Sequence, residues 1–450
     1  MLRTLLKEVK EYKKESIFTP VFMIVEVIFE MLIPLLMVSI IDDGVEKGDI
    51  KHIYMVGAVM IVAAVLGLGA GIAGGRFGAK ASTGFAKNLR EAMFNHIQTY
   101  SFTNIDKFST AGLVTRLTTD VTNVQNAYQM CLRMLMRAPA SLICAMFMAF
   151  TINAKIASVY LVAVILLGAV LLIIMKSAMK HFQAAFPKYD DMNSAVQENI
   201  SAIRVVKAYV REEEETKKFK KTSDNIYKLF VKAEKNLVYN APAMQLTVYS
   251  CILLISWMGA KMIVADTLTT GELMSLLAYC MNILISLMML SFVFVMISMS
   301  VASGERIAEV LTEECDIKNP ENPVHEVKDG SVSFRKVGFS YKDDGDEQVL
   351  RDINLEIRSG ETIGVIGGTG SAKTSLVNLI SRLYDVTEGE VLVGGLNVKA
   401  YDKESLRNQV AVVLQNNVLF SGTILENLRW GNKDATEEEC IDACRQACAD

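Results

Sequence analysis

The sequence predicts an α-helical domain of six membrane spans with long helical extensions outside the membrane, followed by an α/β domain. Hydrophobic residues make up 51% of the 450 residues, and the mean hydropathy is +0.30, which is unusual for a soluble protein. The long apolar runs lie almost entirely before Ser300. After Ser331, short strand-like and helix-like segments surround a Gly-rich turn, a pattern typical of an α/β domain.

Six segments approach the length of about 20 mostly apolar residues that a membrane-spanning helix needs. They are residues 17–41, 53–75, 138–152, 156–175, 244–265 and 273–300. The third is short, so we expect its helix to start earlier, among Met130–Met136. No small-residue cleavage site follows the first segment, which indicates a retained span and not a signal peptide.

The placement of Lys and Arg predicts the orientation of the spans. The basic N-terminus is expected in the cytoplasm, and the acid-rich link 42–52 outside. The long charged links 76–137 and 176–243 fall on the cytoplasmic side, as does everything after Ser300. We expect the membrane helices to continue into the cytoplasm and turn near Thr103–Gly112 and Tyr209–Glu215, forming levers that a cytoplasmic motor can push.

Glu26 and Glu30 lie four residues apart on one face of the first span. Ionisable groups at membrane depth are costly and usually face the bundle interior or a water-filled cavity. Two interpretations stay open. The carboxylates either line a substrate cavity or lie near the inner interface, where they reach water.

Charge and cysteine usage limit the other functions. A net charge of −4 gives no indication of a nucleic-acid partner, and the eight Cys show no disulfide framework. Cys440, Cys444 and Cys448 are spaced to line one side of a helix. A partly buried helix face is favoured there over a metal site.

One short stretch predicts a phosphate-binding loop. It consists of Gly367, Gly368, Thr369, Gly370, Ser371, Ala372, Lys373 and Thr374. A Gly-rich turn lets backbone N–H groups surround phosphates, Lys adds a mobile positive charge, and the Thr hydroxyl can bind Mg²⁺. The strand-like run 361–366 precedes the loop, and a helix-like run from Ser375 follows, so a helix N-terminus should face the phosphates. The alternative is a plain Gly-rich turn between strand and helix.

Ala372 departs from this pattern, which has Gly before the Lys. If the position requires a positive φ, the Cβ costs about 1 kcal/mol and weakens the nucleotide site several-fold. If φ is negative, the methyl group is nearly silent.

Composition also predicts the domain boundaries. Residues 1–311 form the transmembrane domain, the polar, Pro-containing stretch 312–327 a linker, and residues 328–450 the α/β domain. The strands expected in the last part are residues 331–335, 337–341, 349–357, 361–366, 390–393 and 410–414.

With these features the chain resembles a half-transporter of the ATP-binding cassette exporter family, of the bacterial multidrug or lipid type. Tyr341 occupies the position where this family stacks an aromatic ring on adenine, and Gln415, followed by residues 418–428, matches its glutamine loop. Residues 112–121 and 198–209 are similar to the family's two inner links. The resemblance covers most of the chain.

The resemblance implies roles for single residues. Lys373 would bind the β- and γ-phosphates of ATP, Thr374 would bind Mg²⁺, and the loop with Ser375 would hold the remaining oxygens. Gln415 would contact Mg²⁺ or the attacking water. The alternatives are an aromatic core residue for Tyr341 and a solvated loop residue for Gln415.

The resemblance also implies that the α/β part is a partial P-loop nucleotide-binding domain. The family's signature sequence, catalytic Glu and switch His are expected after Asp450, so this stretch should bind ATP without hydrolysing it alone, as part of a longer gene product. Leu414 is a further departure, because the family commonly has Pro there.

The implied function is ATP-driven export of amphiphilic small molecules, lipids or peptides across the bacterial inner membrane, by alternating access. The partner is a second half-transporter, and the irregular loop favours a heterodimer over a homodimer. The alternative function is a regulatory half-subunit with a degenerate, poorly hydrolysing site. A purely structural membrane protein would not explain the loop, Tyr341 and Gln415 together.

Overall fold

The computed structural model describes residues 1–341, 348–414 and 418–449. The chain divides into two compact units. The first comprises Met1–Thr99 and Ser109–Glu313, and the second Tyr100–Phe108 and Glu314–Asp450. The short segment Tyr100–Phe108, from within the link 76–137, therefore belongs to the second unit.

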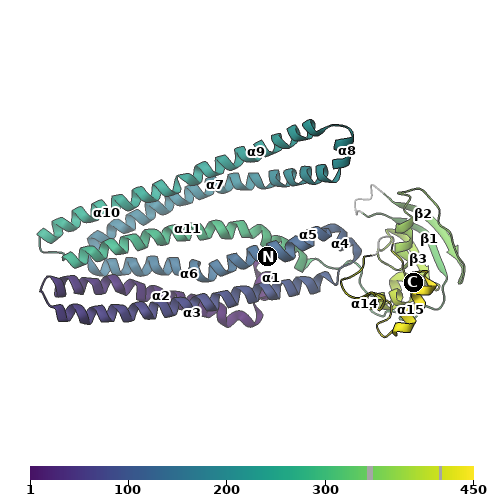
Figure 1. Ribbon diagram of the computed structural model, residues 1–450, viewed down its shortest axis with the longest axis horizontal. Helices are drawn as coiled ribbons and strands as arrows, with labels where there is room; N and C mark the ends of the chain where they lie inside the picture. The colour runs from purple at the N-terminus through teal and green to yellow at the C-terminus, as the bar shows by residue number, and fades with distance from the viewer. Residues whose placement is uncertain (342–347, 415–417, 450) are drawn as a thin grey trace. The chain divides into compact units, whose positions relative to one another are not determined.

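Helices make up the first unit (Figure 1). They are α1 (Leu2–Lys7), α2 (Lys13–Ser39), α3 (Ile50–Ile97), α5 (Thr110–Thr115), α6 (Val121–Ile152), α7 (Ala154–Ser201), α8 (Ile203–Ala208), α9 (Glu212–Val238), α10 (Asn240–Val264) and α11 (Thr270–Thr312). One 3₁₀ turn, η1 (Lys10–Tyr12), and two π-helical segments, η2 (Ile40–Val45) and η3 (Arg116–Asp120), adjoin some of them. Among the described residues, six helical segments are long and apolar enough to cross a membrane, as predicted.

The lengths of these helices confirm the predicted extensions. α3 and α7 have 48 residues each and α11 has 43, well beyond the about 20 that a bilayer requires. The third span belongs to a helix that starts at Val121, earlier than the range expected from its apolar run. An apolar run does not show where its helix begins, because a helix can continue out of the bilayer into polar sequence without a break in its hydrogen bonding.

Close helix contacts hold α2 against α3. Gly71, Gly74 and Gly78 of α3 face Glu26, Met23 and Thr19 of α2, and a Cβ at Gly74 would lie within 2.4 Å of the Met23 Cε. Small residues at such spacings let two backbones approach in a membrane, where packing replaces the hydrophobic effect.

Buried tyrosines join α11 to its neighbours. Tyr279 donates a hydrogen bond of 2.8 Å to the Met31 carbonyl of α2, and Tyr160 of α7 donates one of 2.9 Å to the Leu276 carbonyl. Both rings are almost completely buried. Their hydroxyl groups are thereby satisfied where no water can replace a missing partner.

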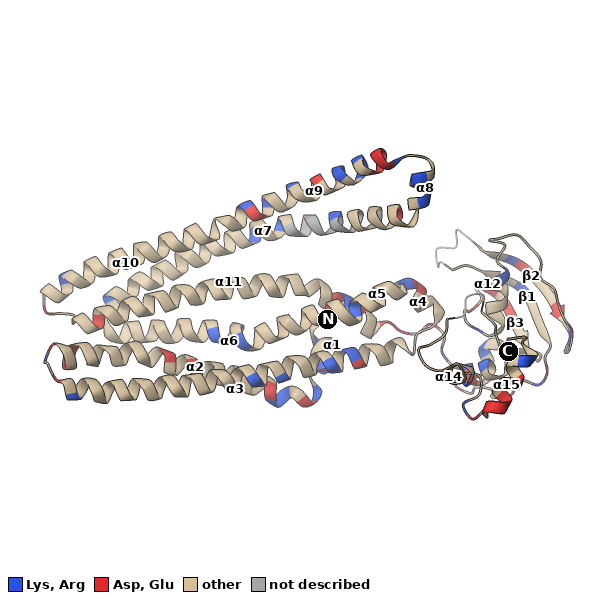
Figure 2. Ribbon diagram, in the orientation of Figure 1, with Lys and Arg blue, Asp and Glu red and all other residues tan. Residues whose placement is uncertain are grey.

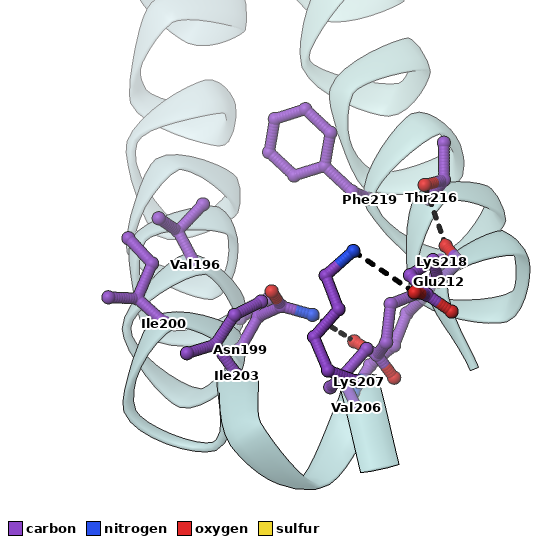
Figure 3. A pocket seen from close by; sticks show the side chains of 12 residues that line it. Val196, Asn199, Ile200, Ile203, Val206, Lys207, Glu212, Thr216, Lys218 and Phe219 are labelled. Carbon is purple, nitrogen blue, oxygen red and sulfur yellow. Dashed lines mark hydrogen bonds and ion pairs between the residues drawn. The ribbon is translucent and has the colours of Figure 1, made fainter. Parts of the chain in front are cut away.

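The second half of α7 forms a hairpin with α9 that diverges from α6 and α11 (Figure 1). The short helix α8 closes this hairpin, and the chain turns again between Tyr209 and Arg211. Side chains of α7, α8 and α9 line a pocket at the tip (Figure 3). Ion pairing of Lys207 with Glu212 and a hydrogen bond from Asn199 to Glu215, both 3.0 Å, fix the tip.

The start of α6 and the end of α11 are joined by ion pairs. The Asp120 carboxylate is buried and accepts a hydrogen bond of 2.7 Å from Arg306 Nε. One turn away, Arg116 lies 2.9 Å from Glu309. These contacts fix the exit of α11, which leads along the chain into the second unit.

We expect Asp120→Ala to lower the unfolding free energy by about 1.5–3 kcal/mol, the usual loss for hydrogen bonds to a charged group. The matched control is Asp43→Ala. Asp43 pairs with Lys47 on the surface, so its loss should cost less than about 1 kcal/mol. Thermal unfolding of both variants in detergent provides the measurement. Equal shifts of the melting temperature would show that the buried Asp120 pair stabilises the protein no more than the surface pair of Asp43.

The second unit contains a four-stranded antiparallel sheet with the order β2-β1-β3-β4. Its elements are α4 (Phe102–Phe108), β1 (Val332–Phe339), β2 (Leu350–Ile357), α12 (Lys373–Ile380), β3 (Glu388–Val393), β4 (Leu396–Asn397), η4 (Val398–Ala400), α13 (Lys403–Gln409), α14 (Ile424–Leu428) and α15 (Glu437–Gln446). The core between sheet and helices includes Phe334, Val337, Leu379, Val391 and Tyr401.

Two of the predicted strands are wrong. Residues 361–366 and 410–414 have no regular secondary structure, and their apolar side chains are open, with Ile366 97% and Val413 89% exposed. An apolar run becomes a strand only where a neighbouring strand accepts its backbone hydrogen bonds. The described sheet ends at β2 and β4, and neither run pairs with it. The expected strands 331–335 and 337–341, by contrast, join into the single strand β1.

Residues 314–327, within the stretch expected to be a linker, pack on the second unit. Ile317 is buried, and the Ile317 carbonyl accepts a hydrogen bond of 2.8 Å from Lys403 Nζ. Val324 forms a parallel bridge with Tyr401. The domain boundaries themselves stay a prediction.

Candidate nucleotide site

The Gly-rich loop runs directly into α12, which begins at Lys373. Gly370 and Ala372 both have a positive φ, of 84° and 61°. Residues in this left-handed region turn successive backbone N–H groups toward one side and form anion-binding concavities. The first N–H groups of α12 also lack partners in a preceding turn. The predicted helix after the loop is therefore confirmed, whereas the strand before it is not.

Lys373 folds over the loop. Its Nζ donates hydrogen bonds of 2.8 Å to the Gly367 and Gly368 carbonyls and one of 3.2 Å to Ser371 Oγ. Each acceptor is a weak neutral partner compared with a phosphate oxygen. The ammonium is thus placed at the loop and held by contacts that a phosphate can replace.

Tyr341 lies beside the first turn of α12. Its hydroxyl is 2.8 Å from the Oγ of the buried Ser375, which follows Thr374 in the chain. The Tyr341 side chain is 45% exposed, so one part of the ring remains open to a ligand. The adenine-stacking role of Tyr341 stays a prediction.

Tyr341 also belongs to an aromatic group around Tyr384. The Tyr341 ring meets Phe339 and Tyr384 edge to face, with centroid distances of 4.7 and 5.2 Å. Phe102 of α4 approaches Tyr384 from another direction at 5.9 Å. Such contacts stabilise aromatic groups beyond the area that they bury.

A hydrogen bond ties Tyr384 to α4. The Tyr384 hydroxyl donates to Asp106 Oδ2 at 2.7 Å. Burial first, and then the hydrogen bond to Asp106, raise the pKa of Tyr384, so its hydroxyl stays protonated near neutral pH. A residue of the first cytoplasmic turn is thereby linked to the candidate adenine platform.

The sequence did not predict Phe102, Asp106 or Tyr384 as functional residues. Phe102 and Asp106 lie in or beside the turn expected near Thr103–Gly112, and Tyr384 follows α12 by four residues. Asp106 and Tyr384 are separated by 278 positions. No local spacing could therefore have shown that they meet.

Gln415 lies outside the described residues, so its predicted contact with Mg²⁺ or water stays a prediction. Further along the chain, side-chain contacts join residues 420–430. Asn427 of α14 holds the Phe420 backbone through hydrogen bonds of 2.8 and 2.9 Å, and Phe420 stacks on Trp430 at 4.3 Å.

The residues at the loop fit a nucleotide with its metal ion. Lys373 offers one mobile cation, and Thr374 is exposed in the first turn of α12 with a hydroxyl suited to Mg²⁺. On α15, Cys440 is buried and Cys444 is half-buried, whereas the exposed Cys448 lies beyond the end of this helix, so the three cysteines do not line one helix side as predicted. Within the part of the chain that the structure describes, no three His, Cys, Asp or Glu residues group as metal ligands.

The φ of 61° at Ala372 decides between the two interpretations of this residue. A Cβ in this region costs about 1 kcal/mol. If the nucleotide-bound loop keeps this conformation more strictly than the free loop, Ala372→Gly should lower the dissociation constant for ATP about three- to fivefold, since 1.4 kcal/mol corresponds to a factor of ten.

Titration with a fluorescent ATP analogue gives the measurement, and Ala400→Gly is the matched control. Ala400 lies in η4, away from the loop sequence, and has no positive φ. An unchanged affinity in Ala372→Gly would mean that the methyl group costs the same with and without nucleotide.

Comparison with known proteins covers both units. Residues 16–304 match the family described as "ABC transporter transmembrane region", and residues 350–448 match the family described as "ABC transporter". The uncharacterized ABC transporter ATP-binding protein YfiB of Bacillus subtilis is 34% identical over 427 residues, covering 95% of this chain and 74% of the relative.

Two further relatives extend this result. The uncharacterized ABC transporter ATP-binding protein Rv1273c of Mycobacterium tuberculosis is 32% identical over all of this chain and 78% of its own length. An ATP-dependent lipid A-core flippase of Syntrophus aciditrophicus is 29% identical over 80% of this chain and 60% of its own length.

Proposed function

This chain belongs to the ABC transporter family, and we propose that it is one half of an exporter that moves amphiphilic small molecules, lipids or peptides by alternating access. One observation supports the proposal: among the described residues, six apolar helices lie in the same chain as a Gly-rich loop that leads into the N-terminus of α12, with Lys373 folded over it. The lipid A-core flippase among the relatives supports lipids as one of the candidate substrate classes.

We place the protein in the bacterial inner membrane with its N-terminus and nucleotide-binding part in the cytoplasm. The distribution of Lys and Arg supports this orientation, because the N-terminus and the long links carry most of them. The relatives are bacterial proteins, which supports the choice of membrane.

The partner in this proposal is a second half-transporter. The hairpin of α7 and α9 supports it, because its tip, outside the apolar spans, exposes apolar side chains, including Ile200 (66%), Tyr209 (73%) and Val210 (79%). Exposed apolar groups of this size typically mark a protein interface. We favour a heterodimer, since the Cβ of Ala372 at a positive φ is expected to make this nucleotide site poorer than one with Gly.

In this proposal the residues at the loop bind the nucleotide, and the aromatic group connects it to α4. When bound, Mg²⁺ would neutralise phosphate charge beside Thr374. Lys373 would exchange its carbonyl partners for the β- and γ-phosphates, and Tyr341 would hold the adenine ring. Tyr384 would pass a shift of Tyr341 to Asp106 and so to α4, which follows α3 along the chain.

The complete protein and its partner half, reconstituted in liposomes, provide the test. We expect ATPase activity that rises when an amphiphilic substrate is added, together with ATP-dependent movement of that substrate. The absence of both in a pair that binds ATP would contradict the exporter proposal.

The left-handed Ala372 favours one second candidate, a regulatory half-subunit that binds ATP without productive hydrolysis. The two proposals differ in one result. Normal turnover at this site, measured in a pair whose other site carries the equivalent Lys→Ala change, would exclude the regulatory role.

A further inference from the structure

Two acidic and two basic side chains line one pocket between α2, α3 and α6. Glu26 and Glu30 come from α2, Arg133 and Arg137 from α6, and the pocket has a volume of about 430 Å³. Figure 2 shows few charged residues along the middle of these helices, with red on α2 and blue on α6 as exceptions. Charges inside a membrane are costly and indicate a function by default.

Helix geometry gives the depth of this group along α2 and α6. At 1.5 Å per residue, Glu30 lies about 18 Å along α2 and η2 from Asp42, and Arg137 about 24 Å along α6 from Asn153. Asn153 lies between α6 and α7, and Asp42 lies in η2, shortly before the turn that leads to α3. Against a core about 30 Å thick, Glu30 starts inside it and Arg137 starts toward its inner edge.

Arg137 is shared by the two carboxylates. Its Nη1 lies 3.1 Å from Glu26 Oε1 and its Nη2 lies 2.9 Å from Glu30 Oε2. One guanidinium balances only one of two negative charges. Glu26 is the deeper of the two, whereas the Glu30 side chain is 42% exposed and its Oε1 has no polar partner among the described residues.

Arg133 is a second cation of this pocket, and neither Glu26 nor Glu30 pairs with it. Its stem lies against Gly78 of α3, and across the described residues it forms neither an ion pair nor a hydrogen bond. The pocket therefore offers one cation and the open Glu30 Oε1 to a ligand, beside a buried Glu26 Oε2 that has no hydrogen-bond partner among the described residues, while the sum of the four charges is zero.

The remaining wall is apolar. Phe29 and Ile33 of α2 and Leu68 and Ile72 of α3 line it, and Gly67 leaves room between them. The volume lies within the about 300–1,000 Å³ of small-molecule sites, which are mostly apolar with a few polar groups that set orientation. An apolar wall beside two separate opposite charges is complementary to an amphiphile with a zwitterionic head.

We propose that this pocket binds amphiphiles whose head group carries both an anionic group and an ammonium. Arg133 holds the anionic group, Glu30 holds the ammonium, and the wall of Phe29, Ile33, Leu68 and Ile72 holds the adjoining alkyl chain. The inference names a substrate class for the proposed exporter. It rests on that function only in assuming that the bound ligand is then transported. Binding itself requires no ATP.

The first experiment uses the complete wild-type protein in detergent, without nucleotide, and native mass spectrometry to measure bound ligand. The probes are lysophosphatidylethanolamine, lysophosphatidylglycerol with the same chain but no ammonium, dodecylammonium with no anion, and glycerophosphoethanolamine with no chain. We expect the first to bind at least tenfold more tightly than each of the others. Equal binding of the two lysolipids, or tight binding of the chain-free head group, would overturn the proposal.

Variants then assign the two charges. Arg133→Gln and Glu30→Gln should each weaken lysophosphatidylethanolamine about tenfold or more, as expected for a lost hydrogen bond to a charged group. Arg133→Gln should leave dodecylammonium binding unchanged, and Glu30→Gln should leave lysophosphatidylglycerol unchanged. Arg76→Gln, an exposed arginine on α3, is the matched control.

The outcomes separate this site from the exporter function. If a variant fails to fold, the wild-type ranking of the four probes still decides. Selective binding without ATP-driven export would contradict the proposed function and support the pocket, whereas export with no preference for the zwitterion would overturn the pocket alone. Equal affinities in wild type, Arg133→Gln and Glu30→Gln would also overturn it.

Discussion

Replacing Lys373 with Ala should weaken ATP binding about ten- to a hundredfold, the factor that corresponds to one or two charge-assisted hydrogen bonds. The physical reason is that Lys373 is the cation placed on the loop, and its present partners are the Gly367 and Gly368 carbonyls and Ser371. Those partners are neutral, so the loop should survive the change with little loss of stability. Titration of the complete protein with a fluorescent ATP analogue measures the effect.

Lys399→Ala is the control for this experiment. Lys399 is an exposed lysine of the same unit, on η4, and its removal changes the net charge equally. An equal loss of affinity in both variants would show a general effect of charge and contradict the phosphate-binding role of Lys373. In the reconstituted pair, Lys373→Ala should also reduce substrate-stimulated ATPase activity.

The second large effect is expected at Tyr384. Tyr384→Ala should lower the unfolding free energy by about 3–5 kcal/mol, as for other large buried aromatic residues. Tyr384→Phe keeps the ring between Phe102 and Tyr341 and removes only the hydrogen bond to Asp106. If this bond links α4 to the nucleotide site, Tyr384→Phe should bring substrate-stimulated ATPase activity down toward the basal rate.

Tyr401→Phe separates this link from general stability. Tyr401 is also buried, and its hydroxyl donates a hydrogen bond of 2.8 Å to the Val393 carbonyl without contact to α4. We expect Tyr401→Phe to lower the melting temperature while substrate stimulation remains. A double-mutant cycle of Tyr384→Phe with Asp106→Ala should give a coupling energy of about 1–2 kcal/mol for stability, and a value near zero would mean that the contact carries no energy.

Local patterns predicted the parts of this protein that depend on local rules. A bilayer requires a fixed helix length and leaves no backbone hydrogen bond open, so apolar runs alone locate the six spans. The residues of the loop 367–374 were predicted because their role depends on backbone freedom and on functional groups at consecutive positions. Gln415 was predicted on the same basis and stays a prediction.

Strand pairing was less accessible to such patterns. The runs 361–366 and 410–414 have the composition of buried strands but no partner in the described sheet, whereas β1 joins two segments that the sequence separated. Hydrophobic content indicates what a segment can bury. The neighbours that it pairs with decide whether it becomes a strand.

The amino-acid sequence by itself determined the membrane spans and the long helices, and it predicts the phosphate loop, since each follows from contiguous residues. Tertiary structure alone decided that Ala372 has a positive φ, that Tyr384 meets Asp106, and that Arg137 is shared by Glu26 and Glu30 while Arg133 is left over. These features join residues up to 278 positions apart. Contacts over such separations depend on how helices and strands pack, and that packing leaves no regular spacing in the chain.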